Sequence, residues 1–331
     1  MSVHRPDADT AMLPTHIGDT VVTVGTFDGV HRGHLDVLVR LAARAHQTDR
    51  NSLLLTFEPH PLELLNPEKA PLLLTARDEK LAAIAATGID YVAILPFTRE
   101  LANHSAEEFV DLVLRDRFHM AELLIGHDHG FGRGRTGDVE TLRTMGAARG
   151  FAVDVVAPVE TSDGQPVSST RIRRAVAAGD LATAEAGLGR RYSVAGEVVA
   201  GESRGRALGF PTLNIVPESP RKLLPPDGVY AVDVETPRGR FGGMMHLGPR
   251  PTFGDERRTI EAHLFDAADQ FYGDAVQVSF VARLRDTRRF NGSAELMKQL
   301  VSDEAGARRA LTLLAEPGNL KGSTPFPPST P

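Results

Sequence analysis

The sequence contains no cysteine, which excludes disulfide bonds, thiolate nucleophiles and cysteine-ligated zinc. This composition suits the reducing cytoplasm, where we expect the protein to be located. Aromatic residues make up only 6% of the chain and the formal net charge is −6. A stacking surface or a broad basic footprint for nucleic acid is therefore not expected.

Long apolar runs are lacking as well. Stretches such as "SLLLTF" and "PLLLT" are far shorter than the roughly 20 residues of a membrane-spanning helix, so no membrane partner is expected. Residues 1–16 lack the apolar core of a secretion signal and are predicted to be a flexible leader. Residues 316–331 are rich in proline, glycine and serine and are predicted to be a disordered tail.

The 331 residues, 41% of them hydrophobic, are enough for two domains with ordinary cores. Over residues 17–188, short apolar runs such as "VVTV" alternate with segments of helical periodicity. This alternation predicts an α/β, Rossmann-like domain with a parallel sheet, whose sites lie at the carboxyl ends of the strands. Over residues 189–315, short strands between glycine, proline and aspartate turns predict a small antiparallel β-barrel with a C-terminal helix.

The stretch "GTFDGVHRGH" begins at Gly25, directly after the first predicted strand. Gly25 and Gly29 allow the backbone to turn sharply, and His31 and His34 share a face where a helix begins. The free N–H groups and the dipole of a helix N-terminus favour anions. The stretch therefore predicts a polyphosphate-binding corner. A simple turn with a capping or packed histidine is the alternative.

The same stretch resembles the HxGH signature of the nucleotidyltransferase superfamily. Its context resembles the adenylyltransferase module of bacterial bifunctional riboflavin kinase/FAD synthetases. Three further motifs of that module follow in order, namely "TFEPHP", "LIGHDHGFGRGRTGD" and "VSSTRIRRAVAAGD". The resemblance spans most of residues 20–188. It implies transfer of the adenylyl group of ATP to FMN, which yields FAD and pyrophosphate.

The phosphate of FMN is already ionised and needs no protein base, so such a module supplies alignment and charge stabilisation. The resemblance implies that His31, His34 and Arg173 are catalytic because they stabilise phosphate charge. The other nucleotide or phosphate contacts that it implies are Gly25, Phe27, Asp28, Gly33, Asp128, Ser169 and Thr170.

His129 departs from this family, which usually has phenylalanine at that position. One consequence is an altered packing of flavin or adenine. The alternative is a metal site formed with His127 and Asp128, although no third-ligand spacing accompanies these residues. Asp128 is interpreted either as a ligand-orienting carboxylate or as a turn cap.

A second glycine-dense stretch, "AGEVVAGESRGRALGFPTLNI", begins at Ala195. Thr212 and Asn214 alternate along an extended segment, so their oxygens face one side. A hydroxyl and an amide carbonyl are hard oxygen donors suited to Mg²⁺. A β-turn capped by these two residues is the alternative.

This stretch closely resembles the riboflavin kinase signature, and the resemblance covers about residues 190–312. It implies that the barrel phosphorylates riboflavin to FMN with Mg²⁺ and ATP. The implied catalytic base is Glu261, which takes the proton of the attacking 5′-hydroxyl. The implied nucleotide contacts are Gly201, Arg206 and Gly209, and the implied metal ligands are Thr212 and Asn214.

The expected small molecules are riboflavin, FMN, ATP and FAD, and the oligomeric state is not predicted. His246 and Thr287 replace residues that are frequent in the kinase family, and His263 is interpreted as a packed surface residue. Three other functions stay open. One is a riboflavin kinase whose first module is weakened or acts on another phosphate. The second is a nucleotidyltransferase for another phosphate substrate, with the barrel only a binding appendage, and the third is a non-enzymatic flavin-binding or regulatory protein.

Overall fold

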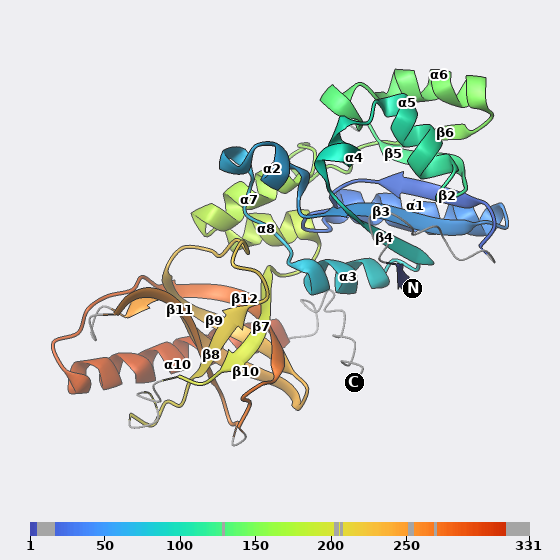
Figure 1. Ribbon diagram of the computed structural model, residues 1–331. Helices are drawn as coiled ribbons and strands as arrows, with labels where there is room; N and C mark the ends of the chain where they lie inside the picture. Colours follow the sequence, from blue (N-terminus) through green and yellow to red (C-terminus); the bar gives the residue numbers. More distant parts are fainter. Residues whose placement is uncertain are drawn as a thin grey trace. The chain divides into compact units, whose positions relative to one another are not determined.

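The computed structural model describes residues 1–4, 17–127, 130–201, 205, 208–250, 255–267 and 270–315 (Figure 1). The chain forms two compact units. The sheet unit comprises Met1–Pro71 and Ala83–Ser168, and the barrel unit comprises Leu72–Ala82 and Ser169–Pro331.

The sheet unit contains a parallel six-stranded sheet in the order β1-β4-β3-β2-β5-β6. The strands are β1 (Ser2–His4), β2 (Thr20–Val24), β3 (Asn51–Glu58), β4 (Tyr91–Pro96), β5 (Met120–Gly126) and β6 (Ala152–Val156). The predicted Rossmann-like sheet is confirmed. β1 was not predicted as a strand, and it pairs with β4 from Ser2 opposite Tyr91. Residues 5–16 of the predicted leader lie outside the described residues.

Helices follow the strands, as the alternating pattern predicts. They are α1 (Arg32–Gln47), α2 (Pro61–Leu65), η1 (Pro67–Lys69), α3 (Arg77–Ala85), α4 (Arg99–Asn103), α5 (Ala106–Glu108), the π-helical η2 (Phe109–Arg115), η3 (Arg133–Arg135) and α6 (Val139–Arg149). α1 packs on β2, β3 and β5. A buried cluster joins Phe109 and Val113 of η2 and Leu142 of α6 to Val22 and Leu55 of the sheet. Helices thus cover the sheet, as a parallel sheet requires.

The barrel unit contains a closed antiparallel barrel in the order β10-β11-β8-β7-β12-β9. Its strands are β7 (Ser193–Val199), β8 (Leu213–Pro217), β9 (Gly228–Thr236), β10 (Gly239–Arg250), β11 (Asp255–Leu264) and β12 (Ala275–Arg285). Its helices are α7 (Ser169–Ala178), α8 (Leu181–Leu188) and α10 (Ser293–Ala315), and α10 packs across β9, β10 and β12 (Figure 1). The predicted barrel and C-terminal helix are confirmed.

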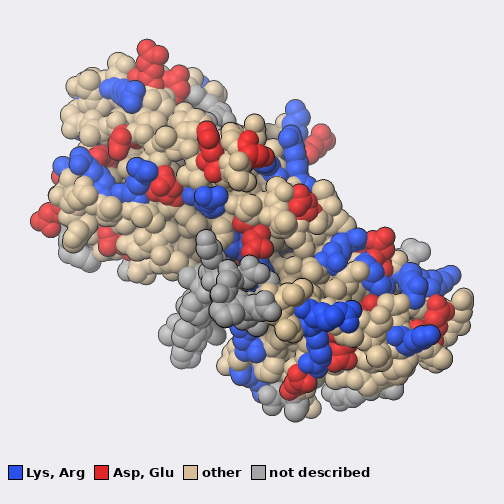
Figure 2. Space-filling model, turned by 180° about the vertical axis from the view of Figure 1, so that it is seen from behind, with Lys and Arg blue, Asp and Glu red and all other residues tan. Residues whose placement is uncertain are grey.

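The barrel unit also includes two stretches, 72–82 and 169–188, that lie within the predicted first domain of residues 17–188. The contacts within the structure therefore group the chain differently from its sequence motifs. Among the described residues, no helix combines the length and apolar character that crossing a bilayer requires. On the face drawn in Figure 2, basic and acidic side chains lie interspersed over the surface rather than segregated by sign.

Two candidate active sites

The predicted phosphate-binding corner lies at the carboxyl end of β2, where the strand order reverses. The chain runs from β2 to β3 and β4 on one side and then to β5 on the other side of β2. Ligands of open α/β sheets bind at such switch points. The N–H of Gly25 donates to the carbonyl oxygen of Leu55 at 3.0 Å, which ties the start of the corner to the neighbouring strand.

The backbone of this corner is held in unusual conformations. Phe27 and Val30 have φ values of 47° and 38°, in a region that residues with side chains rarely adopt, and Gly29 has a φ of 86°. Phe27 is 4% exposed and Val30 is fully buried. Packing of the two side chains therefore holds a strained loop, and strain of this kind is concentrated at functional sites.

His31 and His34 lie together at the start of α1. His31 is the N-cap residue, and its Nδ1 accepts a hydrogen bond from the backbone N–H of His34 at 3.3 Å. This bond leaves Nε2 of His31 to carry the proton of a neutral ring. The two rings stack with centroids 3.6 Å apart, and the ring of Phe27 lies 4.6 Å from that of His34. A Cβ atom on Gly33 would lie 3.2 Å from the ring of His31, so glycine permits this approach.

The other residues predicted for adenylyl transfer are spread over the two units. Ser169 and Thr170 form the first turn of α7, in the barrel unit. Arg173 on the same helix donates from Nε to the carbonyl oxygen of Leu72 at 3.0 Å. Asp128 and His129 lie outside the described residues. Within the described ranges, no group of three His, Asp or Glu side chains is arranged to hold a metal ion.

The barrel brings together three polar residues from different strands. On β11, Glu261 lies directly opposite Asn214 of β8 and directly opposite His246 of β10. Residues that are opposite one another in an antiparallel pair share a face of the sheet. The buried neighbours Ile260 and Ala262 point to the other face. Strand register therefore places the predicted base beside a predicted metal ligand.

The carboxylate of Glu261 is oriented by a neighbour on its own strand. Thr259 lies on the same strand face, and its Oγ1 donates to Oε1 of Glu261 at 3.0 Å. Thr259 Oγ1 also lies 3.3 Å from the carbonyl oxygen of Gly248 on β10. These contacts fix the position of the Glu261 side chain relative to the paired strands β10 and β11.

The side chain of Asn214 lies against the backbone of Gly201, which explains why glycine occupies position 201 of the second motif. A Cβ atom on Gly201 would lie only 1.9 Å from Nδ2 of Asn214, so no residue with a side chain fits without displacing the amide. Gly209 has a φ of +78° and follows Leu208, whose N–H donates to Gly205 at 3.0 Å in a turn. Arg206 lies outside the described residues.

His263 has a role that the sequence did not predict. Its Nδ1 donates to the carbonyl oxygen of Pro211 at 2.7 Å, and its ring lies 5.2 Å from that of Phe210. Pro211 immediately precedes the predicted metal ligand Thr212. His263 thus anchors the segment that carries Thr212. The signal available in the sequence was the spacing of two residues between Glu261 and His263, which puts both on one strand face.

A pocket of about 670 Å³ lies in the barrel unit beside these residues. Among its lining residues are Gly201, Asn214 and Thr259, together with an apolar wall. The apolar lining residues are Leu72, Val199, Ala200, Ile215, Val216, Pro217, Pro220, Leu224 and Ile260. A few convergent polar groups in an apolar pocket are typical of small-molecule binding.

A histidine pair at a helix start on a sheet switch point, together with a barrel pocket beside a carboxylate, is typical of a two-module, nucleotide-dependent transferase. Residues 13–171 match the model of the FAD synthetase family, and residues 188–311 match that of the riboflavin kinase family. The chain belongs to the family of bifunctional riboflavin kinase/FMN adenylyltransferases. This confirms the resemblance found in both halves of the sequence.

Relatives with that name match most of this chain. The protein from Pseudomonas fluorescens is 40% identical over 301 residues, which are 91% of this chain and 95% of the relative. The protein from Escherichia coli K12 is 38% identical over 292 residues, 87% of this chain and 91% of the relative. A crystal structure of a macrolide-efflux protein from Streptococcus pneumoniae is 30% identical with a TM-score of 0.81, covering 92% of this chain and 98% of that one. Macrolide efflux appears only in the name of that protein and is not ascribed to this chain.

Proposed function

We propose that this chain catalyses two successive transfers from ATP. The barrel unit transfers the γ-phosphoryl group of ATP to the 5′-hydroxyl of riboflavin, which yields FMN and ADP. The site at the end of β2 directs the adenylyl group of a second ATP to the phosphate of FMN, which yields FAD and pyrophosphate. Matches to both families over separate halves of the chain support the pairing of the two reactions.

The observation that carries the kinase assignment is the position of Glu261 opposite Asn214 on one face of the barrel wall. A hydroxyl group is a poor nucleophile until its proton is removed. Glu261 takes that proton as the 5′-oxygen bonds to the γ-phosphorus and the bond from the γ-phosphorus to the bridging oxygen breaks. The carboxylate is held for this task by Thr259.

The residues next to Glu261 fit a magnesium ion. Thr212 and Asn214 offer hard oxygen donors. Because Gly201 has no side chain, the amide of Asn214 fits beside its backbone. When bound, Mg²⁺ neutralises charge on the phosphates of ATP. Gly201, Arg206 and Gly209 are the proposed backbone and side-chain contacts to the nucleotide in this module.

The adenylyl transfer needs charge stabilisation rather than a base. An oxygen of the FMN phosphate bonds to the α-phosphorus of ATP, and the bond to the bridging oxygen of pyrophosphate breaks. His31 and His34 at the helix start are proposed to stabilise the charge on the phosphates. Arg173 is proposed to neutralise phosphate charge as well. The proposed contacts to nucleotide or phosphate are Gly25, Phe27, Asp28, Gly33, Asp128, Ser169 and Thr170.

Incubation of the purified chain with riboflavin, MgCl₂ and ATP, followed by chromatography, tests both reactions. We expect FMN to appear first and FAD afterwards, and supplied FMN to be converted to FAD without riboflavin. FMN without FAD would leave a riboflavin kinase alone, and no product from either flavin would leave a binding protein. Omission of MgCl₂ in the presence of a chelator tests the metal. The cytoplasmic location stays a prediction, which cell fractionation tests.

A further inference from the structure

A short segment from the first half of the chain is part of the barrel unit. This inserted segment, Leu72–Ala82, lies inside the range that matches the FAD synthetase family, more than a hundred residues before the barrel begins. It pairs with the stretch between β8 and β9. The N–H of Leu73 donates to the carbonyl oxygen of Arg221, and the N–H of Leu223 donates to that of Leu73, both at 2.8 Å.

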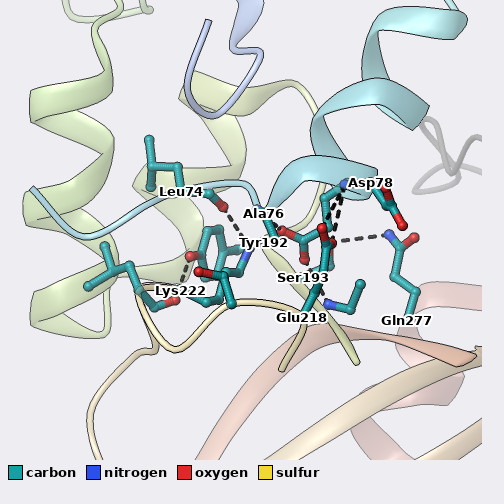
Figure 3. A network of polar contacts seen from close by, with 12 residues as sticks. Leu74, Ala76, Asp78, Tyr192, Ser193, Glu218, Lys222 and Gln277 are labelled. Atoms are coloured by element: carbon teal, nitrogen blue, oxygen red, sulfur yellow. Dashed lines mark hydrogen bonds and ion pairs between the residues drawn. The ribbon is translucent and has the colours of Figure 1, made fainter. Parts of the chain in front are cut away.

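A buried ion pair fastens the inserted segment. Lys222 is 5% exposed and Glu79 is 6% exposed. Nζ of Lys222 donates to Oε2 of Glu79 at 2.7 Å and to the carbonyl oxygen of Leu74 at 2.6 Å. Figure 3 shows the contact of Lys222 with Leu74, and the centroid of the Tyr192 ring lies 4.6 Å from Nζ.

Glu79 also joins the inserted segment to the first strand of the barrel. Its Oε1 accepts from the N–H of Ala195 on β7 at 2.7 Å, and its Oε2 accepts from the N–H of Ala76 at 2.7 Å. Nearby, the N–H of Asp78 donates to the carboxylate of Glu218 at 3.1 and 3.2 Å (Figure 3). One carboxylate therefore holds a strand, a helix start and a lysine together.

The inserted segment reaches the pocket that contains Asn214. Leu72 and Lys222 are both among the lining residues of that pocket. Leu72 is 46% exposed, so its side chain is not needed to fill the core. Leu72 lines the wall of an apolar pocket, which explains why an apolar side chain occupies this exposed position. Glu79 is not among the lining residues, and its ion pair with the lining residue Lys222 connects it to the pocket.

We propose that the inserted segment completes the nucleotide pocket of the kinase. Leu72 supplies an apolar contact to the nucleoside part of ATP, and the pair of Glu79 and Lys222 is a positioning pair that holds Leu72 in place. This inference rests on the proposed kinase function of the Asn214 pocket. It makes riboflavin phosphorylation dependent on residues outside 188–311, the range that matches the riboflavin kinase family.

Leu72→Glu tests the contact itself. An exposed leucine can be replaced without loss of core packing, and the new carboxylate removes the apolar contact and places a charged group against the nucleoside. We expect the KM for ATP in riboflavin phosphorylation to rise about tenfold, which corresponds to about 1.4 kcal/mol. The kcat of the kinase should change little. The backbone carbonyl of Leu72, which accepts from Arg173, is retained, so conversion of supplied FMN to FAD should change much less than riboflavin phosphorylation. Leu112→Glu is the control, because Leu112 is 50% exposed and lies in the sheet unit.

Glu79→Gln tests the positioning pair. The amide has the shape of the carboxylate but carries a donor where Lys222 or a backbone N–H already donates. We expect a severalfold rise in the KM for ATP of the kinase reaction, with the KM for ATP of FMN adenylylation unchanged. A purely structural pair would lower the thermal midpoint without this split between the two reactions, and that result would overturn the positioning role.

The outcomes separate this inference from the function on which it rests. If the unaltered chain does not phosphorylate riboflavin, the proposed kinase function fails. If it does, and Leu72→Glu has the same KM for ATP as Leu112→Glu, the inserted segment has no part in nucleotide binding and the inference is wrong. An equal loss of both reactions in Leu72→Glu, with an unchanged thermal midpoint, would also overturn it.

Discussion

The two candidate sites differ in the side chains that would meet the attacking group. In the sheet unit, the rings of His31 and His34 are stacked with centroids 3.6 Å apart at a helix start. In the barrel unit, the carboxylate of Glu261 lies on a strand opposite Asn214. The phosphate of FMN is ionised before it reacts, whereas the hydroxyl of riboflavin must lose a proton. In the proposed assignment, the ionisation of the nucleophile accounts for a base in the barrel site and none in the corner of the sheet unit.

The sites also differ in what holds them in shape. The corner in the sheet unit is formed by consecutive residues, and burial of Phe27 and Val30 maintains its strained backbone. The barrel site is formed by β8, β10 and β11, and its geometry depends on the register between them. Changes that act on one kind of support should therefore leave the other reaction intact.

The largest separation of the two reactions is expected from Glu261→Gln. The amide cannot take the proton of the 5′-hydroxyl, so the kcat for riboflavin phosphorylation should fall about 10²–10⁴-fold. Conversion of supplied FMN to FAD should be unchanged. Both rates are measured by chromatography of the flavins, with Glu197→Gln, an exposed glutamate of β7, as the control. A kinase rate within about twofold of the unaltered chain would remove Glu261 from its proposed role.

The reverse separation is expected from His34→Ala. Loss of one group that stabilises phosphate charge should lower the rate of FMN adenylylation by about 10²–10³-fold. Riboflavin phosphorylation should continue at its normal rate. His46→Ala is the matched control, because His46 lies in the last turn of the same helix, away from the corner. Equal decreases in both reactions would mean that the substitution damages the fold rather than the phosphate site.

The geometry of the corner in the sheet unit could be predicted from sequence, and that of the barrel site only in part. The motif from Gly25 to His34 contains its own turn, cap and histidine pair, so the corner follows from ten consecutive residues. The motifs of the barrel site were recognised, but the pairing of Glu261 with both Asn214 and His246 depends on strand register. A shift of one residue would turn every side chain to the other face, and strand composition alone does not decide this.

The inserted segment shows a further limit of prediction from the sequence. From the sequence, this segment reads as the start of a helix that belongs to the first domain. Glu79 lies in the first turn of that helix, where an acidic residue is common and indicates no distant partner. The partner of Glu79 is Lys222, 143 residues further along the chain. A contact at such a separation leaves no periodicity in the sequence, so neither the burial of this pair nor the place of Leu72 in the pocket could be predicted.

A smaller effect, confined to the barrel site, is expected from Gly201→Ala. The new Cβ atom would meet the amide of Asn214, which must move away. Loss of one contact from the displaced Asn214 amide to the charged phosphates or their metal is worth about 1.5 kcal/mol, which corresponds to a rise of roughly tenfold in the KM for ATP of the kinase reaction. Gly292→Ala is the control, because a Cβ atom there meets no other atom within 4 Å. A normal KM for ATP would show that Asn214 does not contact the bound nucleotide or its metal.

The smallest effect is expected from His263→Ala. The substitution removes the hydrogen bond to the carbonyl oxygen of Pro211, which holds the segment leading to Thr212. One neutral hydrogen bond contributes about 1 kcal/mol, so the kinase should lose roughly fivefold in kcat/KM for ATP while FMN adenylylation stays constant. His263→Gln retains a side-chain donor and should recover part of the loss. If both variants lose the same activity, the ring packing against Phe210 rather than the hydrogen bond positions Thr212, because glutamine restores the donor but not the ring.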